Sequence, residues 1–222
     1  MSSMEFSPGS GTYDFSRDWF SANIPAWDHI FTREKPKRVL EIGSFEGRSA
    51  CYTIEKLGAL FPSGTSLTCV DNWMGGQEHR DAGGFYQAVM SDTERRFDHN
   101  MRVALAKVGN RVTLSKVKQN SREALARLLV TDPIEQFDLI FIDGSHEAPD
   151  VLADSVLAFP LLRVGGTLIF DDYIWSDQAP EIRDPLRMPK IAIDAFVNIY
   201  QRKIEFYHRL PLWQFYLRKV AS

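Results

Sequence analysis

Cysteine and long apolar runs are both scarce in this chain, and each scarcity removes a class of protein. Only two cysteines occur among 222 residues, too few for a disulfide-stabilised scaffold and typical of a reducing compartment. No apolar run approaches the ~18–20 residues that a membrane-spanning helix needs. Residues 1–15 also lack the basic and then apolar pattern of a secretory signal. We therefore expect a cytoplasmic protein without a membrane partner.

A large net charge of either sign is missing as well. The chain has 26 Lys and Arg residues against 29 Asp and Glu residues, a formal net charge of −3. Because so balanced a surface creates no basic field, we expect no nucleic-acid partner. The content of 44% hydrophobic and 25% charged residues is that of an ordinary globular domain. We expect residues 1–35 to form an N-terminal tail and cap helices, and residues 36–222 to form one domain.

From Arg38 onward, segments typical of strands alternate with segments typical of helices. Such alternation predicts an α/β fold with a mostly parallel, doubly wound sheet and helices on both faces. The last two strands are joined by too few residues for a crossover, so they must be antiparallel, with a tight Leu-Pro turn between them. We expect strands at 38–43, 66–71, 111–117, 137–143 and 167–173 and two within 203–220, and helices at 47–61, around 97–108, and at 121–130, 148–166 (closed by a Gly165–Gly166 turn) and 189–200.

Aromatic and branched residues recur at near-helical spacing between residues 16 and 34. The pattern predicts one or two short helices separated at Pro25. Their apolar side chains either cover an edge of the sheet or form a lid over a small ligand. The aromatic residues within 19–31 could also provide a contact face for a homo-oligomer.

The stretch VLEIGSFEG, from Val39 to Gly47, begins as an apolar strand and ends as a turn. In an open parallel sheet, ligands bind beyond the carboxyl ends of the strands, so this turn is the expected site. Gly43 allows a close backbone approach or a positive φ angle, and Gly47 allows the next helix to start against the strand. Asp71 ends the following strand, where a carboxylate can accept both hydroxyls of a ribose. These residues predict a nucleoside-type cofactor, with a helix-packing glycine pair as the alternative.

The residues inside this turn narrow the identity of the nucleoside. A dinucleotide seats its pyrophosphate on the helix N-terminus, usually through G-x-G-x-x-G. Here Phe45 occupies the place of the second glycine, and Glu46 would repel phosphate. A cofactor that lacks phosphate and carries a positive centre suits Glu41 and Glu46 better. S-adenosylmethionine, with its sulfonium and amine, is therefore favoured over NAD.

Three carboxylates follow two strands that are expected to be neighbours. Asp143 ends one strand, Asp171 and Asp172 end the next, and adjacent strands lie only ~4.8 Å apart. Crowded carboxylates repel one another unless they are protonated or bridged by a cation, and oxygen ligands select a hard ion such as Mg²⁺, Ca²⁺ or Mn²⁺. Both members of the pair can serve only if the strand turns there. Alternatively, Asp143 contacts the cofactor amine and one of the pair caps a loop.

Four ordered stretches resemble the class I S-adenosylmethionine-dependent methyltransferases: VLEIGSFEGRSA, LTCVDNWMGGQEH, FDLIFIDGSH and LLRVGGTLIFDDY. The likeness spans about residues 36–220, and within the superfamily it is greatest to the bacterial small-molecule branch that includes macrocin-type O-methyltransferases. It implies a seven-stranded sheet of order 3-2-1-4-5-7-6 with strand seven antiparallel. It also implies a metal site, because metal-dependent relatives place an aspartate after strand four and an acidic pair after strand five. The ligands here would be Asp143, Asp171 and Asp172.

The resemblance also implies which residues bind the cofactor. Asp71 would hold the ribose hydroxyls, and Asn72 or Trp73 would lie against the adenine. Ser121, which opens the helix after strand three, would lie at the adenine edge, or would cap that helix instead. Asp143 would also lie at the cofactor mouth. The residues of the first turn that would line the methionine end are Glu41, Gly43, Ser44 and Gly47.

The implied reaction is methyl transfer to a hydroxyl of a small molecule of the sugar or natural-product type. Magnesium or another divalent cation would bind the hydroxyl as a Lewis acid and lower its pKa, and positioning would account for much of the rate. The catalytic candidates are Asp143 and His146. His146 lies where metal-dependent catechol-type relatives carry a lysine base, and histidine titrates near neutrality, although a hydrogen bond to nearby backbone is the alternative. His79 lies either on a lid over the substrate or on an exposed surface.

Three other functions compete with this interpretation. A nicotinamide-dependent oxidoreductase could use a similar sheet, but Phe45 and Glu46 argue against NAD. A non-catalytic binding module would be expected to lose the acidic residues, yet Asp71 and Asp143 are present. An iron-dependent hydroxylase would need histidine ligands, and only His146 is placed to serve.

Overall fold

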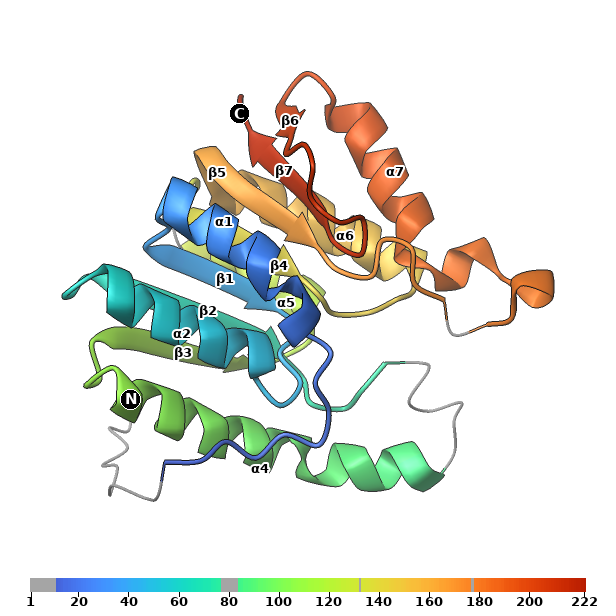
Figure 1. The fold of residues 1–222 in the computed structure, drawn as a ribbon. Helices are drawn as coiled ribbons and strands as arrows, with labels where there is room; N and C mark the ends of the chain where they lie inside the picture. The colour runs from blue at the N-terminus through green and yellow to red at the C-terminus, as the bar shows by residue number, and fades with distance from the viewer. Residues whose placement is uncertain (1–10, 77–83, 132, 177) are drawn as a thin grey trace.

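Seven strands form a single sheet in the computed structural model, which describes residues 11–76, 84–131, 133–176 and 178–222. The strands are β1 (Arg38–Ile42), β2 (Thr65–Asp71), β3 (Val112–Lys118), β4 (Phe137–Ile142), β5 (Leu162–Phe170), β6 (Ile204–Phe206) and β7 (Phe215–Lys219). Their order is β3-β2-β1-β4-β5-β7-β6 (Figure 1). β1 to β5 are parallel, and β7 is antiparallel to both β5 and β6. The predicted fold class, strand order and antiparallel end are confirmed.

Helices cover both faces of the sheet (Figure 1). On one face lie α1 (Ile24–Glu34), α2 (Arg48–Leu60) and α4 (Gly84–Lys107), and on the other α5 (Ser121–Thr131), α6 (Ala148–Ala158) and α7 (Pro189–Tyr200). Each face has its own apolar core, because alternate side chains of a strand point to opposite sides. Val39 belongs to the core under α1, α2 and α4, whereas Leu40 belongs to the core under α5, α6 and α7. Among the described residues, no helix is long and apolar enough to cross a membrane.

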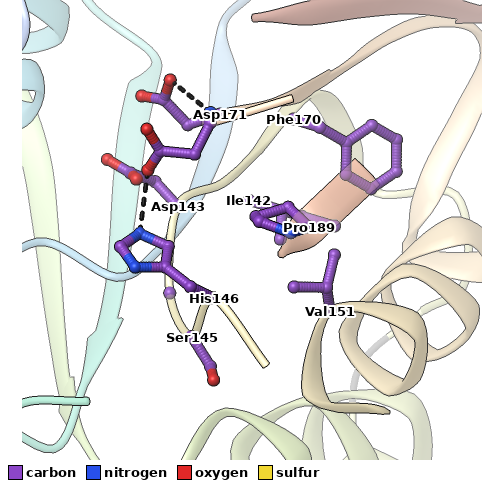
Figure 2. Close-up of a pocket in the computed structure, with 10 residues that line it drawn as sticks. Ile142, Asp143, Ser145, His146, Val151, Phe170, Asp171 and Pro189 are labelled. Carbon is purple, nitrogen blue, oxygen red and sulfur yellow. Dashed lines mark hydrogen bonds and ion pairs between the residues drawn. The ribbon is translucent and has the colours of Figure 1, made fainter. Parts of the chain in front are cut away.

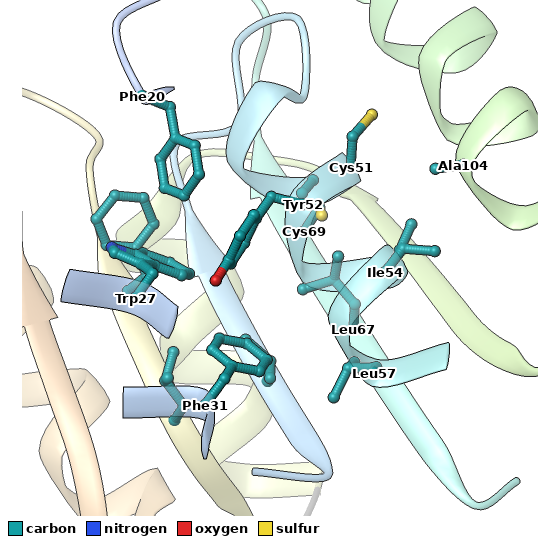
Figure 3. Close-up of a cluster of buried hydrophobic side chains, with 14 of the residues drawn as sticks. Phe20, Trp27, Phe31, Cys51, Tyr52, Ile54, Leu57, Leu67, Cys69 and Ala104 are labelled. Atoms are coloured by element: carbon teal, nitrogen blue, oxygen red, sulfur yellow. The ribbon is translucent and has the colours of Figure 1, made fainter. Parts of the chain in front are cut away.

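The aromatic N-terminal segment mostly covers the sheet. Trp27 and Phe31 of α1 are buried in the first core with Phe20 and Tyr52 (Figure 3), whereas Trp19 is 59% exposed. The prediction of one or two short helices is confirmed, since a 3-10 helix at Ser21–Asn23 precedes α1, but the boundary lies just before Ile24, so that Pro25 is the second residue of α1. Proline is tolerated there since the first N–H groups of a helix have no intrahelical partner.

The second correction concerns the segment between α6 and β5. α6 ends at Ala158, a 3-10 turn follows, and β5 starts at Leu162, so the Gly165–Gly166 pair lies inside the strand and does not close a helix. The β4–β5 pairing changes register between Phe137 and Leu139, which makes this pair a bulge. Gly165 has a φ angle of +82°, and a Cβ on Gly166 would lie 2.9 Å from the Asp138 carbonyl oxygen. Glycine therefore serves this bulge.

The connection between β6 and β7 is also longer than predicted. It covers residues 207–214 and is therefore no tight turn. Its last residue, Gln214, is buried beside the end of β5, because β7 pairs with β5 through Phe170 and Phe215. The hairpin thus brings a residue from late in the chain to the carboxyl edge of the parallel strands.

Candidate active site

The turn after β1 is shaped by two glycines with different tasks. Gly43 has a φ angle of +82°, and a Cβ there would lie 1.9 Å from the carbonyl oxygen of Asp143. Gly47, with a φ angle of +79°, precedes α2, and its Cβ would lie 2.6 Å from the Cε atom of Met101. Gly43 thus allows the turn to approach the end of β4, whereas Gly47 allows α2 to pack against α4. The helix-packing alternative therefore applies to Gly47, whereas the part of Gly43 in binding a cofactor stays a prediction.

Asp71 connects this turn to the end of β2. Its Oδ2 atom accepts hydrogen bonds from the backbone N–H groups of Ser44 at 2.8 Å and Phe45 at 2.9 Å, and its Oδ1 atom accepts from Trp73 N at 2.7 Å. A carboxylate offers about four acceptor positions. Three are used by the backbone, so about one remains for a ribose hydroxyl. The sequence did not predict that backbone N–H groups of the turn would occupy most of the acceptor positions of Asp71.

The two glutamates near the turn have very different surroundings. Glu46 is 1% exposed, and its carboxylate accepts from both the backbone N and the hydroxyl of Ser16 and from Arg96 Nη1 at 2.7 Å. It therefore anchors the N-terminal segment. Glu41 is equally buried, and its Oε2 atom has no hydrogen-bond partner within the described part of the chain. Burial raises the pKa of Glu41 to about 7.

The adenine candidates separate in the structure. Trp73 is buried against Phe97, with ring centroids 4.9 Å apart, and its indole N–H donates to the carbonyl of Phe45. Asn72 lines the cleft, as does Ser121 at the start of α5. The capping role considered for Ser121 belongs to Asn120, whose Oδ1 atom accepts from Arg122 N at 3.1 Å.

The three predicted carboxylates line one pocket at the carboxyl ends of β4 and β5, where Figure 2 shows Asp143 and Asp171. The backbone N–H of Asp143 donates to the carbonyl of Ile42 in β1, and the backbone N–H of Asp171 donates to the carbonyl of Ile142 in β4. The chain turns at once, because Asp172 has a φ angle of +57°. The turn that the sequence required for both acids to serve is therefore present.

These carboxylates share an environment that disfavours full ionisation. Burial, together with the negative charges of Asp171 and Asp172, raises the pKa of Asp143 well above its ordinary value. Burial and the charge of Asp172 also raise the pKa of Asp171 to about 7, although a hydrogen bond from Gln214 lowers it. Since like charges this close cannot all ionise easily, the cluster holds a proton near neutral pH.

His146 completes this rim. Its Nε2 atom lies 2.9 Å from Oδ2 of Asp172, and its ring lies 4.0 Å from that of Trp175. The histidine follows β4 in the loop before α6. The structure thus pairs His146 with a carboxylate at the same edge as Asp143 (Figure 2). His79 lies outside the described residues.

A magnesium site would require several of these ligands to converge on one point. Among the described residues, no group of three or more His, Cys, Asp or Glu side chains is placed to hold a metal ion. Asp171 accepts from Gln214 and from the backbone of Asp172, while Asp172 contacts His146. As arranged here, the predicted ligands Asp143, Asp171 and Asp172 therefore do not fit a metal.

Most of these groups border one cleft of about 1380 Å³. Sites for a single small molecule have volumes of roughly 300–1,000 Å³, so there is room for two ligands. Trp19 and Phe45, whose rings are 5.1 Å apart, also border it. The predicted residues Glu41, Gly47 and Trp73 lie behind its lining. Those that line it are Gly43, Ser44, Asp71, Asn72, Ser121, Asp143, His146, Asp171 and Asp172.

Two residues at the acidic rim escaped the sequence interpretation. Trp175 lies in an irregular segment, where no periodic pattern identifies a ring contact. Gln214 donates from Nε2 to Oδ2 of Asp171 at 2.9 Å. A lone amide in the aromatic run LWQFY was the available signal, but its partner depends on the register of β7 against β5.

Comparison with known proteins identifies the family. Residues 40–173, more than half of the chain, match the model of a family described as a methyltransferase domain. The chain therefore belongs to this methyltransferase family, and the predicted membership of the class I S-adenosylmethionine-dependent methyltransferases is confirmed. No similar sequence was found among curated proteins.

Solved structures share the fold at low sequence identity. An O-methyltransferase from Bacillus cereus in complex with SAH is 16% identical, with a TM-score of 0.61 over 93% of this chain and 84% of that one. The O-methyltransferase TomG from Streptomyces achromogenes, involved in tomaymycin synthesis and in complex with SAM, is 19% identical, with a TM-score of 0.57 over 91% and 81%. CalS11, a TDP-rhamnose 3'-O-methyltransferase of calicheamicin biosynthesis, is 20% identical, with a TM-score of 0.57 over 91% and 81%.

Proposed function

We propose that this protein transfers a methyl group from S-adenosylmethionine to a hydroxyl oxygen of a small molecule. The observation that carries the proposal is the position of the His146–Asp172 pair, which borders the same cleft as the turn formed by Gly43 and Asp71. A group suited to take a proton and a turn suited to hold a nucleoside thus face a common space. The volume of the cleft accommodates a cofactor and an acceptor together.

The residues of the first turn suit a cationic nucleoside. Gly43 lines the cleft without a side chain, and Asp71 keeps about one acceptor position for a ribose hydroxyl. Glu41 and Asp143 provide buried acids whose charged forms a nearby cation would stabilise. Phosphate would meet these acids unfavourably, which supports S-adenosylmethionine over NAD.

The chemistry needs little more than alignment and a proton acceptor. When bound, the cofactor supplies an electrophilic methyl group on a sulfonium, so an O–CH₃ bond forms as the S–CH₃ bond breaks. His146 receives the proton that leaves the acceptor hydroxyl, and the carboxylate of Asp172 stabilises the resulting imidazolium. Trp175 packs against the ring and limits its rotation. The acidic rim thus converts the hydroxyl into a nucleophile at the moment of transfer.

The class of acceptor is inferred from two structural neighbours and from the lining of the cleft. CalS11 is named for a sugar nucleotide and TomG for a natural-product pathway, and a cleft with both charged and aromatic lining suits hydroxylated compounds of either type. We propose an acceptor of the sugar or natural-product type.

None of these steps requires a divalent cation. The magnesium prediction was based on three acidic side chains at one edge of the sheet. In the described part of the chain, these side chains are not arranged as the ligands of a metal ion. The test is calorimetric titration with Mg²⁺ of the wild type and of Asp143→Asn. Heat of binding that disappears in the variant would support a site assembled by the ion, and the absence of heat in the wild type would reject it.

The proposed function is tested by binding and by transfer. Calorimetry should detect S-adenosylmethionine and not NAD⁺, and Asp71→Ala should weaken the former at least about tenfold, since a charged hydrogen bond contributes about 1.5–3 kcal/mol. Glu205→Gln, an exposed residue on β6, is the control. Radiolabelled methyl transfer to a panel of sugars, sugar nucleotides and phenols would then identify the acceptor. Binding of NAD⁺ without S-adenosylmethionine would overturn the proposal.

A further inference from the structure

Gln214 occupies an unusual position for an amide. It is 1% exposed and lies directly before β7, among buried aromatic residues. Because Phe170 pairs with Phe215 in the antiparallel β5–β7 ladder, the next residues along, Asp171 and Gln214, face each other. Burial of a polar side chain is costly unless its hydrogen bonds are made, so each polar atom of Gln214 is expected to have a partner.

Every polar atom of the Gln214 side chain has a partner. Oε1 accepts from the indole Nε1–H of Trp27 at 2.8 Å and from the hydroxyl of Tyr216 at 2.7 Å. Nε2 donates to Oδ2 of Asp171 at 2.9 Å. The indole can only donate, so it fixes Oε1 on its side and directs the NH₂ group to Asp171. The amide cannot be flipped without opposing two donors.

The anchor on the core side is rigid. Trp27 is fully buried, and its ring lies edge-on to Phe141 of β4 at 4.9 Å between centroids. It also packs against Phe20, Phe31 and Tyr52 (Figure 3). A donor held by so many rings cannot follow a displaced amide, so it fixes the position of Gln214.

The contact continues from Asp171 to the reacting edge. Asp171 uses its second oxygen, Oδ1, to accept from the backbone N–H of Asp172 at 2.8 Å. This bond holds the left-handed turn at Asp172, whose own carboxylate lies 2.9 Å from His146. A displacement of Asp171 would therefore alter the turn that aims Asp172 at the histidine.

We propose that Gln214 is a positioning residue, whose amide joins Trp27 in the core to Asp171 and thereby sets the orientation of the His146–Asp172 pair. The role given to His146 rests on the proposed function, but the contacts from Trp27 to Asp172 do not. Gln214 itself exchanges no proton in this account. Its effect is to prevent Asp171 from turning toward the two acids beside it.

Two variants separate positioning from a merely structural role. Gln214→Met removes the amide at similar length, while Tyr216→Phe removes one core bond and keeps the donor to Asp171. In Gln214→Met we expect the ¹H–¹⁵N signals of the His146 ring to move and turnover per folded molecule to fall at least tenfold, with S-adenosylmethionine affinity within twofold of wild type. In Tyr216→Phe, the signals of the His146 ring and the turnover should both stay as in the wild type. Gln201→Met, at an exposed position, is the matched control.

The outcomes are distinct from those of the proposed function. The ring signals require no acceptor, so they test the positioning role even if no methyl transfer is found. Ring signals and turnover in Gln214→Met that coincide with wild type would overturn the inference, whatever the loss of thermal stability. If Gln214→Met does not fold, Gln214→Asn retains an amide for the core but withdraws it from Asp171 by one methylene, and the same measurements decide.

Discussion

The carboxyl edge of this sheet has two halves, and both are rich in acids that are treated differently. At the ends of β1 and β2, Asp71 accepts from three backbone N–H groups, and Glu46 accepts from Ser16 and from the guanidinium of Arg96. At the ends of β4 and β5, Asp143 and Asp171 face further acids, and their pKa values are raised. In the first half, Asp71 and Glu46 are paired with donors, although Glu41 beside them is buried and its pKa is raised, whereas the second half brings several carboxylates together.

The difference indicates how one edge can combine rigidity with reactivity. Carboxylates with sufficient donors hold turns in place, so Asp71 fixes the backbone of the turn that is proposed to bind the cofactor. Carboxylates crowded by like charges respond to any added cation or proton. The half around Asp143 is therefore where proton movement and a positive ligand have their largest effect. Substitutions in the two halves should act on different quantities.

The largest effect should follow from replacing His146. In His146→Gln we expect turnover to fall about 100-fold or more, because general base catalysis typically contributes 10²–10⁴-fold. Affinity for S-adenosylmethionine should stay within twofold, since the turn proposed to hold the cofactor lies in the other half. Steady-state kinetics with the identified acceptor would measure both. The exposed His208→Gln is the control, and a wild-type rate in His146→Gln would remove the base assignment.

The second largest effect should be the loss of stability when Glu46, in the first half, is replaced by a neutral residue. Glu46→Gln leaves the guanidinium of Arg96 without its buried partner, so the free energy of unfolding should fall by about 2 kcal/mol, somewhat less than the 3–5 kcal/mol of a fully buried pair. Urea unfolding with an unchanged slope would measure it. The exposed Glu205→Gln should change stability by less than about 0.5 kcal/mol. Equal stability of the two variants would show that Glu46 is not the anchor.

The smallest effect has the opposite sign. Asp143→Asn removes a charge from the crowded half, so the free energy of unfolding at pH 8 should rise, because burial and the charges of Asp171 and Asp172 destabilise the ionised form of Asp143. Asp138→Asn, at the other end of β4, should destabilise, because Arg163 and two backbone N–H groups outweigh burial and lower the pKa of Asp138.

The pH dependence of this gain follows from proton uptake. The ordinary pKa of Asp143 is 3.8, and in the folded state it is raised, so the native protein keeps a proton that the unfolded chain has lost. Its stability therefore falls as pH rises from about 4 through the raised pKa. The advantage of Asp143→Asn should be absent below about pH 4 and largest at alkaline pH. A stability difference that does not change with pH would contradict the crowding of charge.

Much of the framework was readable because its signals are local. The alternation of apolar strands and helices predicted a mostly parallel, doubly wound sheet, and the family resemblance implied its strand order. The positions of Asp143 and Asp171 after neighbouring strands predicted that these acids meet. Partners set by distant register were not readable. The bulge at Gly165 and the bond between Gln214 and Asp171 both depend on how β5 aligns with its neighbours. The donors that neutralise Glu46 likewise come from Ser16 and Arg96, far apart in the chain.

The position of β7 along the chain has a consequence during synthesis of the protein. Although it lies between β5 and β6 in the sheet, it is the last strand along the chain, and chains are synthesised from the N-terminus at roughly 5–20 residues per second. The ribosome therefore delivers Asp143, Asp171 and His146 before Gln214 exists. A nascent chain that has not yet reached β7 carries these acids without the amide bonded to Asp171, so this contact can form only after residue 214 has been synthesised.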